Sequence, residues 1–222
     1  MTKKTAFIFD LDGVIVATAK FHFLAWQKLA HKIGIEFTEK ENEQLKGVSR
    51  IKSLEKILSW GDKKLSEEEF QRLMAEKNQD YLSHVNQMTP DDILPGVKSF
   101  IDSLKSKNHL IALGSASKNA QTILKSVDFF EVFDAVVDGT KVTKAKPNPE
   151  VFLQAAKLLN TPPELCFVFE DSIAGIQAAN IGGMTSIGIG NKNTLHEADY
   201  CFNNFEEFDY KFFQNLKMKP KL

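Results

Sequence analysis

The chain has 222 residues, 26% of them charged, and a formal net charge of −1. This length suits one large domain or a core with a smaller second domain, and the near-neutral charge excludes a broad electrostatic attraction to nucleic acid or to a membrane surface. Every apolar run is far shorter than the ~20 residues of a membrane span, and the amino terminus leads directly into a strand pattern, so we expect a cytoplasmic protein.

The first expected element is a strand over residues 6–9, where a short apolar run is typical of a strand buried on both faces. It ends at the sequence DLDG, residues 10–13. Asp10 and Asp12 would then lie at the carboxyl end of a parallel strand, where open α/β proteins bind ligands. Taken alone, the stretch could equally be a polar turn, because Asp and Gly are common turn residues.

Residues 17–88 have the pattern of an all-helical block. Apolar residues recur at helical spacing between residues 21 and 33, and a second, short helix is expected near residues 54–58. Ser66 followed by Glu69 predicts a capping box at the start of a third helix. Because the block contains no strand pattern, we expect it to be a cap domain inserted into a core domain formed by residues 1–16 and 89–222.

After residue 95, strand and helix patterns alternate with short loops. This order predicts an α/β fold with a doubly wound, Rossmann-like parallel sheet. A closing amphipathic helix is expected over residues 205–216. Cys166 and Cys201 are too few for a disulfide framework or a zinc site, and Cys166 should pack in the core. The expected strands cover residues 110–113, 135–137, 165–169 and 185–187, and the expected helices cover 97–107, 121–127, 150–159 and the region around 175–179.

Polar residues follow several of these strands. Ser115 comes after one, Glu170 and Asp171 come at the end of another, and Lys146 lies in a loop that can reach the same edge of a parallel sheet. Clustered carboxylates suit Mg²⁺, which prefers oxygen ligands. Ser115, the backbone amides after it and Lys146 would supply hydrogen-bond donors and positive charge to a phosphate group.

This chemistry gives the first acidic pair two distinct roles. Asp10 could attack phosphorus as a carboxylate nucleophile, which forms an aspartyl phosphate and divides one difficult step into two. Asp12 could give a proton to the leaving oxygen and later take one from the incoming hydroxyl.

The sequences DLDGV (10–14), Ser115, Lys146-Pro147 and EDS (170–172) together resemble, in order and spacing, the four motifs of the haloacid dehalogenase (HAD) superfamily of phosphotransferases. The helical block is similar to the small α-helical cap of that superfamily. Three further stretches, TAKFHFLAW (18–26), QLKGVSR (44–50) and SASKN (115–119), resemble its β-phosphoglucomutase family. The similarity extends from residue 7 to about residue 190.

The resemblance implies that Asp10 is phosphorylated, that Asp12 is the general acid and base, and that Ser115 and Lys146 hold the phosphoryl group. It implies one Mg²⁺ bound by Asp10, Glu170, Asp171 and the backbone carbonyl of Asp12. A second phosphate site would contain Arg50, Ser117, Lys118 and Asn119. The full set of implied substrate-binding residues is Thr18, His22, Trp26, Lys46, Gly47, Val48, Arg50, Ala116, Ser117, Lys118 and Asn119.

Several of these residues have an alternative, purely structural interpretation. A lone histidine such as His22, on a helix with an apolar stripe, is more often packed than functional, and Trp26 could simply pack within the helical block. Lys46 and Arg50, four residues apart, could form a solvated helix face. Ile51 and Lys52 replace an acidic pair that the resemblance would place after Arg50, which alters the charge of the cap.

The resemblance implies a monomeric, Mg²⁺-dependent mutase that interconverts β-D-glucose 1-phosphate and glucose 6-phosphate through β-glucose 1,6-bisphosphate, which also primes the enzyme. One alternative is a sugar-phosphate phosphatase of the same superfamily, in which water takes the phosphoryl group from Asp10. Another is a signalling module that only accepts phosphate, but a receiver of that kind has its acidic pair before the phosphoacceptor and no inserted cap. The expected partner is a small sugar phosphate, not nucleic acid or a membrane.

Overall fold

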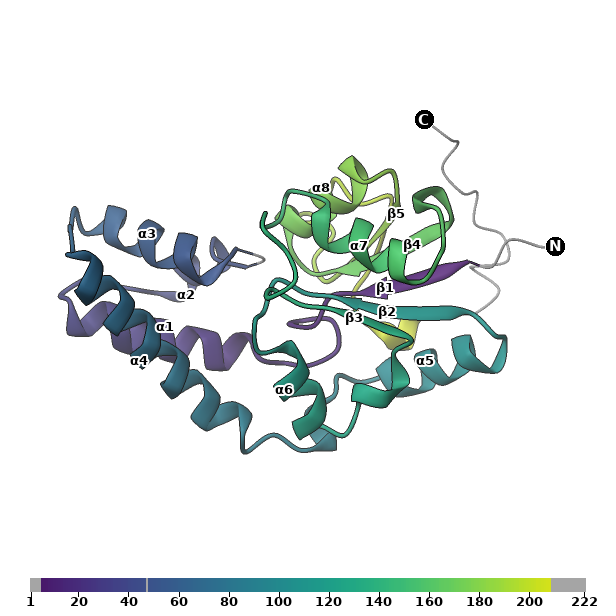
Figure 1. Ribbon diagram of the computed structural model, residues 1–222, viewed down its shortest axis with the longest axis horizontal. Coiled ribbons are helices and arrows are strands. Elements are labelled where there is room, and N and C mark those ends of the chain that lie inside the picture. Colours follow the sequence, from purple (N-terminus) through teal and green to yellow (C-terminus); the bar gives the residue numbers. More distant parts are fainter. Residues whose placement is uncertain (1–4, 47, 209–222) are drawn as a thin grey trace.

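The computed structural model describes residues 5–46 and 48–208. Within them the chain forms a parallel sheet of six strands in the order β3-β2-β1-β4-β5-β6, with eight α-helices (Figure 1). The strands are β1 (Ala6–Phe9), β2 (Leu110–Gly114), β3 (Ala135–Val137), β4 (Cys166–Glu170), β5 (Thr185–Ile189) and β6 (Tyr200–Phe202). The helices are α1 (Ala19–Lys32), α2 (Glu39–Glu43), α3 (Arg50–Trp60), α4 (Glu67–Val85), α5 (Val97–Ser106), α6 (Ala120–Ser126), α7 (Glu150–Leu158) and α8 (Ile173–Ile181).

Alternate residues of each central strand face opposite layers of the molecule. In β1, Phe7 and Phe9 pack in a cluster with apolar residues of α5 and α6, whereas Ala6 and Ile8 pack in a second cluster with residues of α7 and α8. Helices therefore cover both faces of the sheet, and every neighbouring pair of strands is parallel. This confirms the doubly wound α/β fold.

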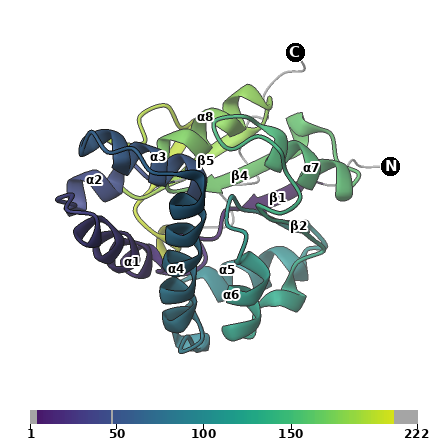
Figure 2. The ribbon, with the colours of Figure 1, turned by 60° about the vertical axis from the view of Figure 1, so that its left-hand side comes forward.

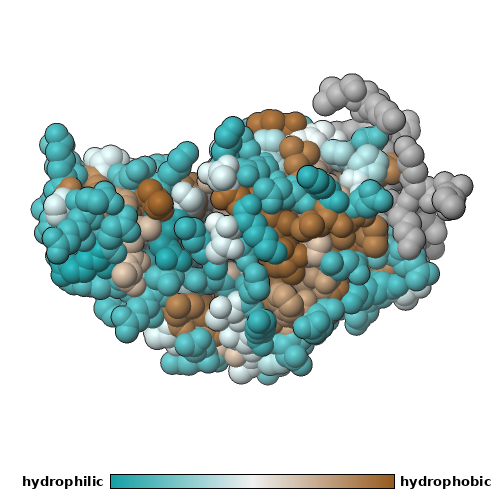
Figure 3. Space-filling model, viewed as in Figure 1, coloured by the Kyte–Doolittle hydropathy of each residue, from teal (hydrophilic) through white to brown (hydrophobic). Residues whose placement is uncertain are grey.

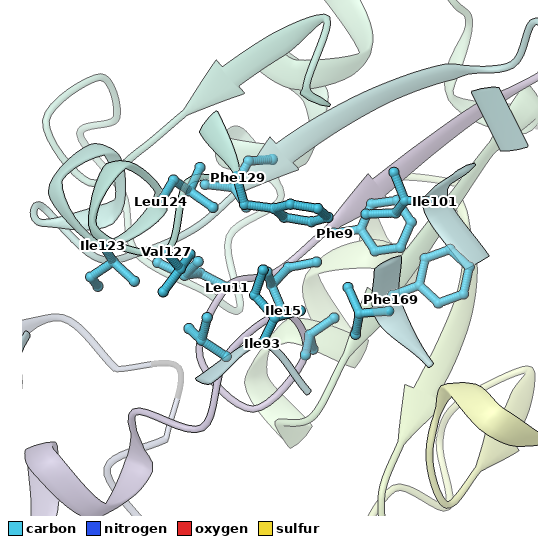
Figure 4. Packing of buried hydrophobic residues seen from close by; sticks show 14 of the residues in the cluster. Phe9, Leu11, Ile15, Ile93, Ile101, Ile123, Leu124, Val127, Phe129 and Phe169 are labelled. Atoms are coloured by element: carbon cyan, nitrogen blue, oxygen red, sulfur yellow. The ribbon is translucent and has the colours of Figure 1, made fainter. Parts of the chain in front are cut away.

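Aromatic stacking joins the two strands at the centre of the sheet. The rings of Phe9 on β1 and Phe169 on β4 stack in nearly parallel planes, with their centroids 4.6 Å apart. Figure 4 shows both rings among the aliphatic side chains of the larger cluster, including Ile15 and Ile101. Because Asp10 and Glu170 immediately follow these two phenylalanines, the same packing fixes the strand ends that carry the carboxylates.

The four helices α1 to α4 stand together beyond the carboxyl ends of the strands (Figure 2). Helices α1, α3 and α4 share a hydrophobic cluster, which includes Trp26, Leu54 and Leu73. The capping box of Ser66 and Glu69 at the start of α4 is present as expected. The exact division into a cap over residues 17–88 and a core over the remainder stays a prediction.

The carboxyl-terminal region differs from expectation. The sequence indicated no strand after residue 187, but Tyr200–Phe202 forms β6 at the edge of the sheet, paired with β5. The prediction of an α-helix over residues 205–216 is wrong at its start. Phe205–Glu207 forms a 3₁₀ turn, and the backbone at Phe208 is extended. Phe205 is buried against the ring of Phe9 there, so tertiary packing sets the local conformation. Residues 209–216 of that expected helix lie outside the described residues.

Two further expectations concern the cysteines and the membrane. Cys166 is buried at the start of β4, Cys201 lies in β6, and both are free thiols. Within the described part of the chain, no helix combines the length and the apolar character needed to cross a bilayer.

We predict that Phe9→Ala lowers the free energy of unfolding by about 3–5 kcal/mol, because it removes a fully buried ring and leaves a cavity. Leu158→Ala is the control, since this side chain is 61% exposed, and it should change the value by no more than about 0.5 kcal/mol. Urea unfolding measures both. A loss below about 1 kcal/mol for Phe9→Ala would contradict the packing described here.

Candidate active site

The carboxyl ends of β1, β2 and β4 bring the predicted catalytic residues to one edge of the sheet. Asp10 follows β1, and its backbone N–H donates to the carbonyl of Phe169 on β4 at 2.9 Å. Ser115 follows β2, and its N–H donates to the carbonyl of Val137 at the end of β3 at 3.0 Å. Glu170 is the last residue of β4. The expectation that residues distant in sequence meet at this edge is therefore confirmed.

A buried lysine links two of the carboxylates. The Lys146 ammonium lies 2.6 Å from Asp10 Oδ1 and also donates to Glu170 Oε1. Its side chain is only 1% exposed. Burial by itself lowers the pKa of Lys146, but the charges of Asp10 and Glu170 outweigh this effect and raise the pKa above its usual value. Lys146 therefore stays protonated beside Asp10.

The second oxygen of Glu170 is also occupied. It accepts hydrogen bonds from the backbone N–H and the hydroxyl of Ser172, both at 2.8 Å. The Ser172 hydroxyl in turn accepts the N–H of Gly175 at 3.1 Å and so caps α8. The cap of this helix thus also fixes the Glu170 carboxylate.

Three carboxylates form a cluster that could hold a cation. Asp10, Glu170 and Asp171 each offer an oxygen within 4.8 Å of the others. Burial raises the pKa of Asp10 to about 7, with Lys146 opposing and Glu170 adding to the shift. Burial, Glu170 and Asp10 likewise raise the pKa of Asp171 well above its usual value. A set of oxygen donors that repel one another in this way fits a hard divalent cation such as Mg²⁺.

Two glycines allow the backbone to approach this cluster. A Cβ atom on Gly13 would lie 2.1 Å from Asp171 Oδ2, and one on Gly175 would lie 2.0 Å from Glu170 Oε1. Gly13 also has a positive φ of 78°, which favours glycine over residues with a side chain. The carboxylates therefore lie against bare backbone, and any larger residue at either position would displace them.

Asp12 has a different environment from Asp10. Its Oδ1 accepts a hydrogen bond from the Thr18 hydroxyl, and His22 Nε2 lies 3.9 Å from the same oxygen. Burial raises the pKa of Asp12, while the bond from Thr18 works in the opposite direction. A carboxyl group with a raised pKa can carry a proton closer to neutral pH, which suits a group that gives and takes protons. Binding of a metal by the Asp12 carbonyl stays a prediction.

A cavity of about 1050 Å³ separates the helical block from the sheet edge. In Figure 3 the molecule is indented along its upper edge, where the helical block on the left meets the remainder. Thr18 is buried behind Asp12, Lys146 and Glu170 are buried at the sheet edge, and Gly47 lies outside the described residues. The predicted site residues that line the cavity are Asp10, Asp12, His22, Trp26, Lys46, Val48, Arg50, Ser115, Ala116, Ser117, Lys118, Asn119 and Asp171.

The loop after Ser115 is held by its own hydroxyl groups. The N–H of Ser117 donates to Ser115 Oγ at 3.1 Å, and the N–H of Asn119 donates to Ser117 Oγ at 3.2 Å. The Asn119 side chain donates to Asn78 Oδ1 on α4 at 2.8 Å, which joins the loop directly to the helical block. From the same block, Lys46 Nζ reaches to within 3.8 Å of Asp171.

Lys77 on α4 is a residue of the cavity that sequence reasoning missed. It is 3% exposed, and its ammonium lies 3.0 Å from His22 Nδ1 and 4.6 Å from the centre of the Trp26 ring. Burial and the charge of Arg50 lower the pKa of Lys77 to about 7. A signal was present in the sequence, because Lys77 occupies a position of the apolar stripe that runs from Phe70 to Tyr81, where helical spacing predicts burial.

Known proteins resemble this chain over most of its length. Residues 4–183 match the family model of the haloacid dehalogenase-like hydrolases. The chain is 44% identical over 196 residues to the β-phosphoglucomutase of Bacillus subtilis, with 87% of each protein covered. It is 31% identical over 184 residues to the phosphorylated carbohydrates phosphatase of Thermotoga maritima, covering 82% of this chain and 83% of that protein. The crystal structure of β-phosphoglucomutase from Clostridium difficile matches with a TM-score of 0.91 and 46% identity, covering 95% and 96% of the two chains.

We predict a pH-dependent effect of Lys77→Met on stability. The pKa of Lys77 is about 7 in the folded protein and 10.5 as its ordinary value, so the unfolded chain binds more protons between these limits. The stability of the wild type should therefore rise with pH in this window, relative to the variant, by about 2.3 kcal/mol from pH 7 to pH 9. Urea unfolding of both proteins at the two pH values tests this, and parallel pH profiles would contradict it.

We also predict that Mg²⁺ stabilises the protein by relieving repulsion among the three carboxylates. At about 100 times its dissociation constant, a ligand that binds only the folded state adds about 2.7 kcal/mol. Asp171→Asn should remove most of this increment, whereas Asp102→Asn, an exposed carboxylate on α5, should retain it. Thermal or urea unfolding with and without Mg²⁺ provides the measurement. An equal increment in both variants would place the ion elsewhere.

Proposed function

The chain belongs to the haloacid dehalogenase-like hydrolase family, and we propose that it acts as an Mg²⁺-dependent β-phosphoglucomutase, interconverting β-D-glucose 1-phosphate and glucose 6-phosphate. The observation that carries this proposal is the lining of the cavity. Groups suited to phosphate line it at two places, at the carboxylate edge with Ser115 and at Arg50 with the loop of Ser117 to Asn119. A mutase needs both, because its bisphosphate intermediate has a phosphate at each end.

In the proposed reaction, a carboxylate oxygen of Asp10 attacks phosphorus while the bond from phosphorus to the sugar oxygen breaks. Lys146, 2.6 Å from Asp10, keeps the attacking carboxylate in place and offsets its charge. The phosphoryl group is then carried by Asp10 as an aspartyl phosphate. In the second half-reaction a different sugar hydroxyl attacks the same phosphorus and releases Asp10.

Asp12 is proposed to manage the proton in both half-reactions. The leaving sugar oxygen takes a proton from the Asp12 carboxyl group, and the attacking hydroxyl later returns one to the carboxylate. Its raised pKa supports this role, and the hydrogen bond from Thr18 orients the group. If water attacked the aspartyl phosphate instead of a sugar hydroxyl, it would give its proton to the same Asp12 carboxylate. At this step a phosphatase and a mutase therefore differ only in which molecule accepts the phosphoryl group.

Mg²⁺, when bound, would be held by Asp10, Glu170, Asp171 and the Asp12 carbonyl, and would offset charge on the phosphoryl oxygens. At the other end of the substrate, the Arg50 guanidinium suits the second phosphate because it binds phosphate oxygens with two parallel hydrogen bonds. Glucose 1,6-bisphosphate is the proposed priming donor, since the cycle begins only once Asp10 carries a phosphoryl group.

We further infer a monomer that works in the cytoplasm, with the helical block as a cap domain. All the proposed catalytic groups come from a single chain, so the site does not require a second copy. The two free cysteines are compatible with a reducing compartment. The hydrophobic cluster shared by α1, α3 and α4 supports a cap domain with a core of its own, while Ala25, Tyr81 and Val85 join α1 and α4 to the core beside the sheet.

A primed assay tests the proposed function. Supplied with β-glucose 1-phosphate, Mg²⁺ and a trace of β-glucose 1,6-bisphosphate, the protein should form glucose 6-phosphate without an equivalent release of inorganic phosphate. Without the bisphosphate the rate should fall sharply, and Asp10→Asn should be inactive because an amide is a poor nucleophile. Stoichiometric release of inorganic phosphate without glucose 6-phosphate would instead identify a phosphatase.

Replacing Arg50 separates the two phosphate sites. We predict that Arg50→Ala lowers the mutase rate by about 100-fold, because the charge-assisted hydrogen bonds to the distal phosphate are lost. Hydrolysis of a small phosphoester, which has no second phosphate, should fall by less than about threefold. Arg72→Ala, an exposed arginine on α4, is the matched control and should leave both rates unchanged. Equal losses of both activities in Arg50→Ala would remove Arg50 from the distal site.

A further inference from the structure

The cavity carries an excess of positive charge at its walls. Among the described residues that line it are three carboxylates and six cationic side chains, although the whole chain has a net charge of −1. The carboxylates are those of Asp10, Asp12 and Asp171, and the cations are those of Lys46, Arg50, Lys52, Lys77, Lys118 and Lys144. Positive charge is therefore concentrated in this hollow and not spread over the surface.

Most of these cations already have a partner or a proposed role. Lys46 lies near Glu43 and Asp171, Lys77 is buried against His22, and Arg50 and Lys118 belong to the proposed distal phosphate site. The remaining two, Lys52 and Lys144, have no assigned role.

Lys52 and Lys144 approach the cavity from different parts of the fold. Lys52 lies in the first turn of α3, and Lys144 lies in the loop between β3 and α7. Both are exposed, and neither ammonium forms an ion pair with a described carboxylate. The carboxylate of Glu150 accepts the backbone N–H groups of Thr143 and Lys144, and these bonds together with the charge of Lys144 lower the pKa of Glu150. Neither ammonium is held in a close ion pair, so both can approach an anion in the cavity.

We propose that Lys52 and Lys144 form an outer phosphate-binding pair at the mouth of the cavity, which captures the phosphate group of a sugar phosphate before the distal site engages it. The inference rests on the proposed function for the identity of the ligand. A lysine ammonium is a mobile, strongly hydrated point charge, which suits capture better than precise recognition. A hollow lined by one sign of charge raises the local concentration of ligands of the opposite sign.

The pair would act most strongly on the bisphosphate. Exposed charges interact over about one Debye length, roughly 8 Å at physiological salt. Because Lys52 and Lys144 line the same cavity, an anion held there would be attracted by both ammonium groups. A sugar bisphosphate carries twice the phosphate charge of a monophosphate. The outer pair would therefore retain this intermediate at the cavity while its two ends exchange places.

Equilibrium binding of glucose 6-phosphate to the Asp10→Asn protein with Mg²⁺ tests the proposal. This background cannot turn the ligand over by either mutase or phosphatase chemistry. Lys52→Gln/Lys144→Gln should raise the dissociation constant about fivefold at low ionic strength and less than about twofold at 0.2 M, because salt screens exposed charges. Lys63→Gln/Lys64→Gln removes two exposed charges from the loop between α3 and α4, outside the cavity lining, and should change neither value.

The contrary outcomes are distinct. Equal dissociation constants for the parent and Lys52→Gln/Lys144→Gln would overturn the proposal, as would no saturable binding of glucose 6-phosphate to the parent. An equal loss in Lys63→Gln/Lys64→Gln would also overturn it, because the effect would then belong to the net charge of the protein. Failure of the primed mutase assay would refute the proposed function without altering these binding constants.

Discussion

The contact on which the site depends is the one between the Lys146 ammonium and the carboxylates of Asp10 and Glu170. Three segments must meet for it to form, namely the end of β1, the end of β4 and the loop before α7. A buried cation without partners would be strongly destabilising, and so would a group of buried carboxylates without a cation. The charges of the site are therefore balanced only when the sheet edge is correctly assembled.

The packing around this contact explains why its geometry is fixed. Stacking of Phe9 on Phe169 aligns the two strands just before Asp10 and Glu170. Ser172 holds the remaining oxygen of Glu170 and at the same time caps α8. A change in the position of Glu170 would thus disturb the cap of α8, and a change in core packing would displace the carboxylates. Stability and chemistry share the same residues at this edge.

Sequence patterns predicted a parallel sheet and the meeting of Asp10, Ser115, Lys146 and Glu170 at its edge, because apolar runs followed by polar residues indicate where strands end. These patterns failed where tertiary contacts determine the local conformation. The three-residue strand β6 is too short to show a periodic pattern, and Phe205 takes its conformation from the aromatic cluster that it joins.

Lys77 was missed because a lysine is normally assigned to the solvent face of a helix, even at a position where spacing predicts burial. The partners of the Asp12 carboxylate depend on the path of the chain between β1 and α1, and residue spacing does not predict that path.

Those partners connect the proton chemistry to the helical block. The groups that contact the Asp12 carboxylate, Thr18 and His22, lie immediately before and within the first turns of α1. His22 is in turn contacted by Lys77 on α4. Residues of both long helices, α1 and α4, therefore influence the position and hydrogen bonding of Asp12 Oδ1. Asp10, in contrast, takes its ion-pair partner, Lys146, from the sheet side alone. A shift of the helical block would therefore change the hydrogen bonding of Asp12, the proposed proton donor, while leaving Asp10 in place. Phosphoryl transfer to a sugar, as opposed to water, would then depend on whether the block is correctly seated when Asp12 gives up its proton.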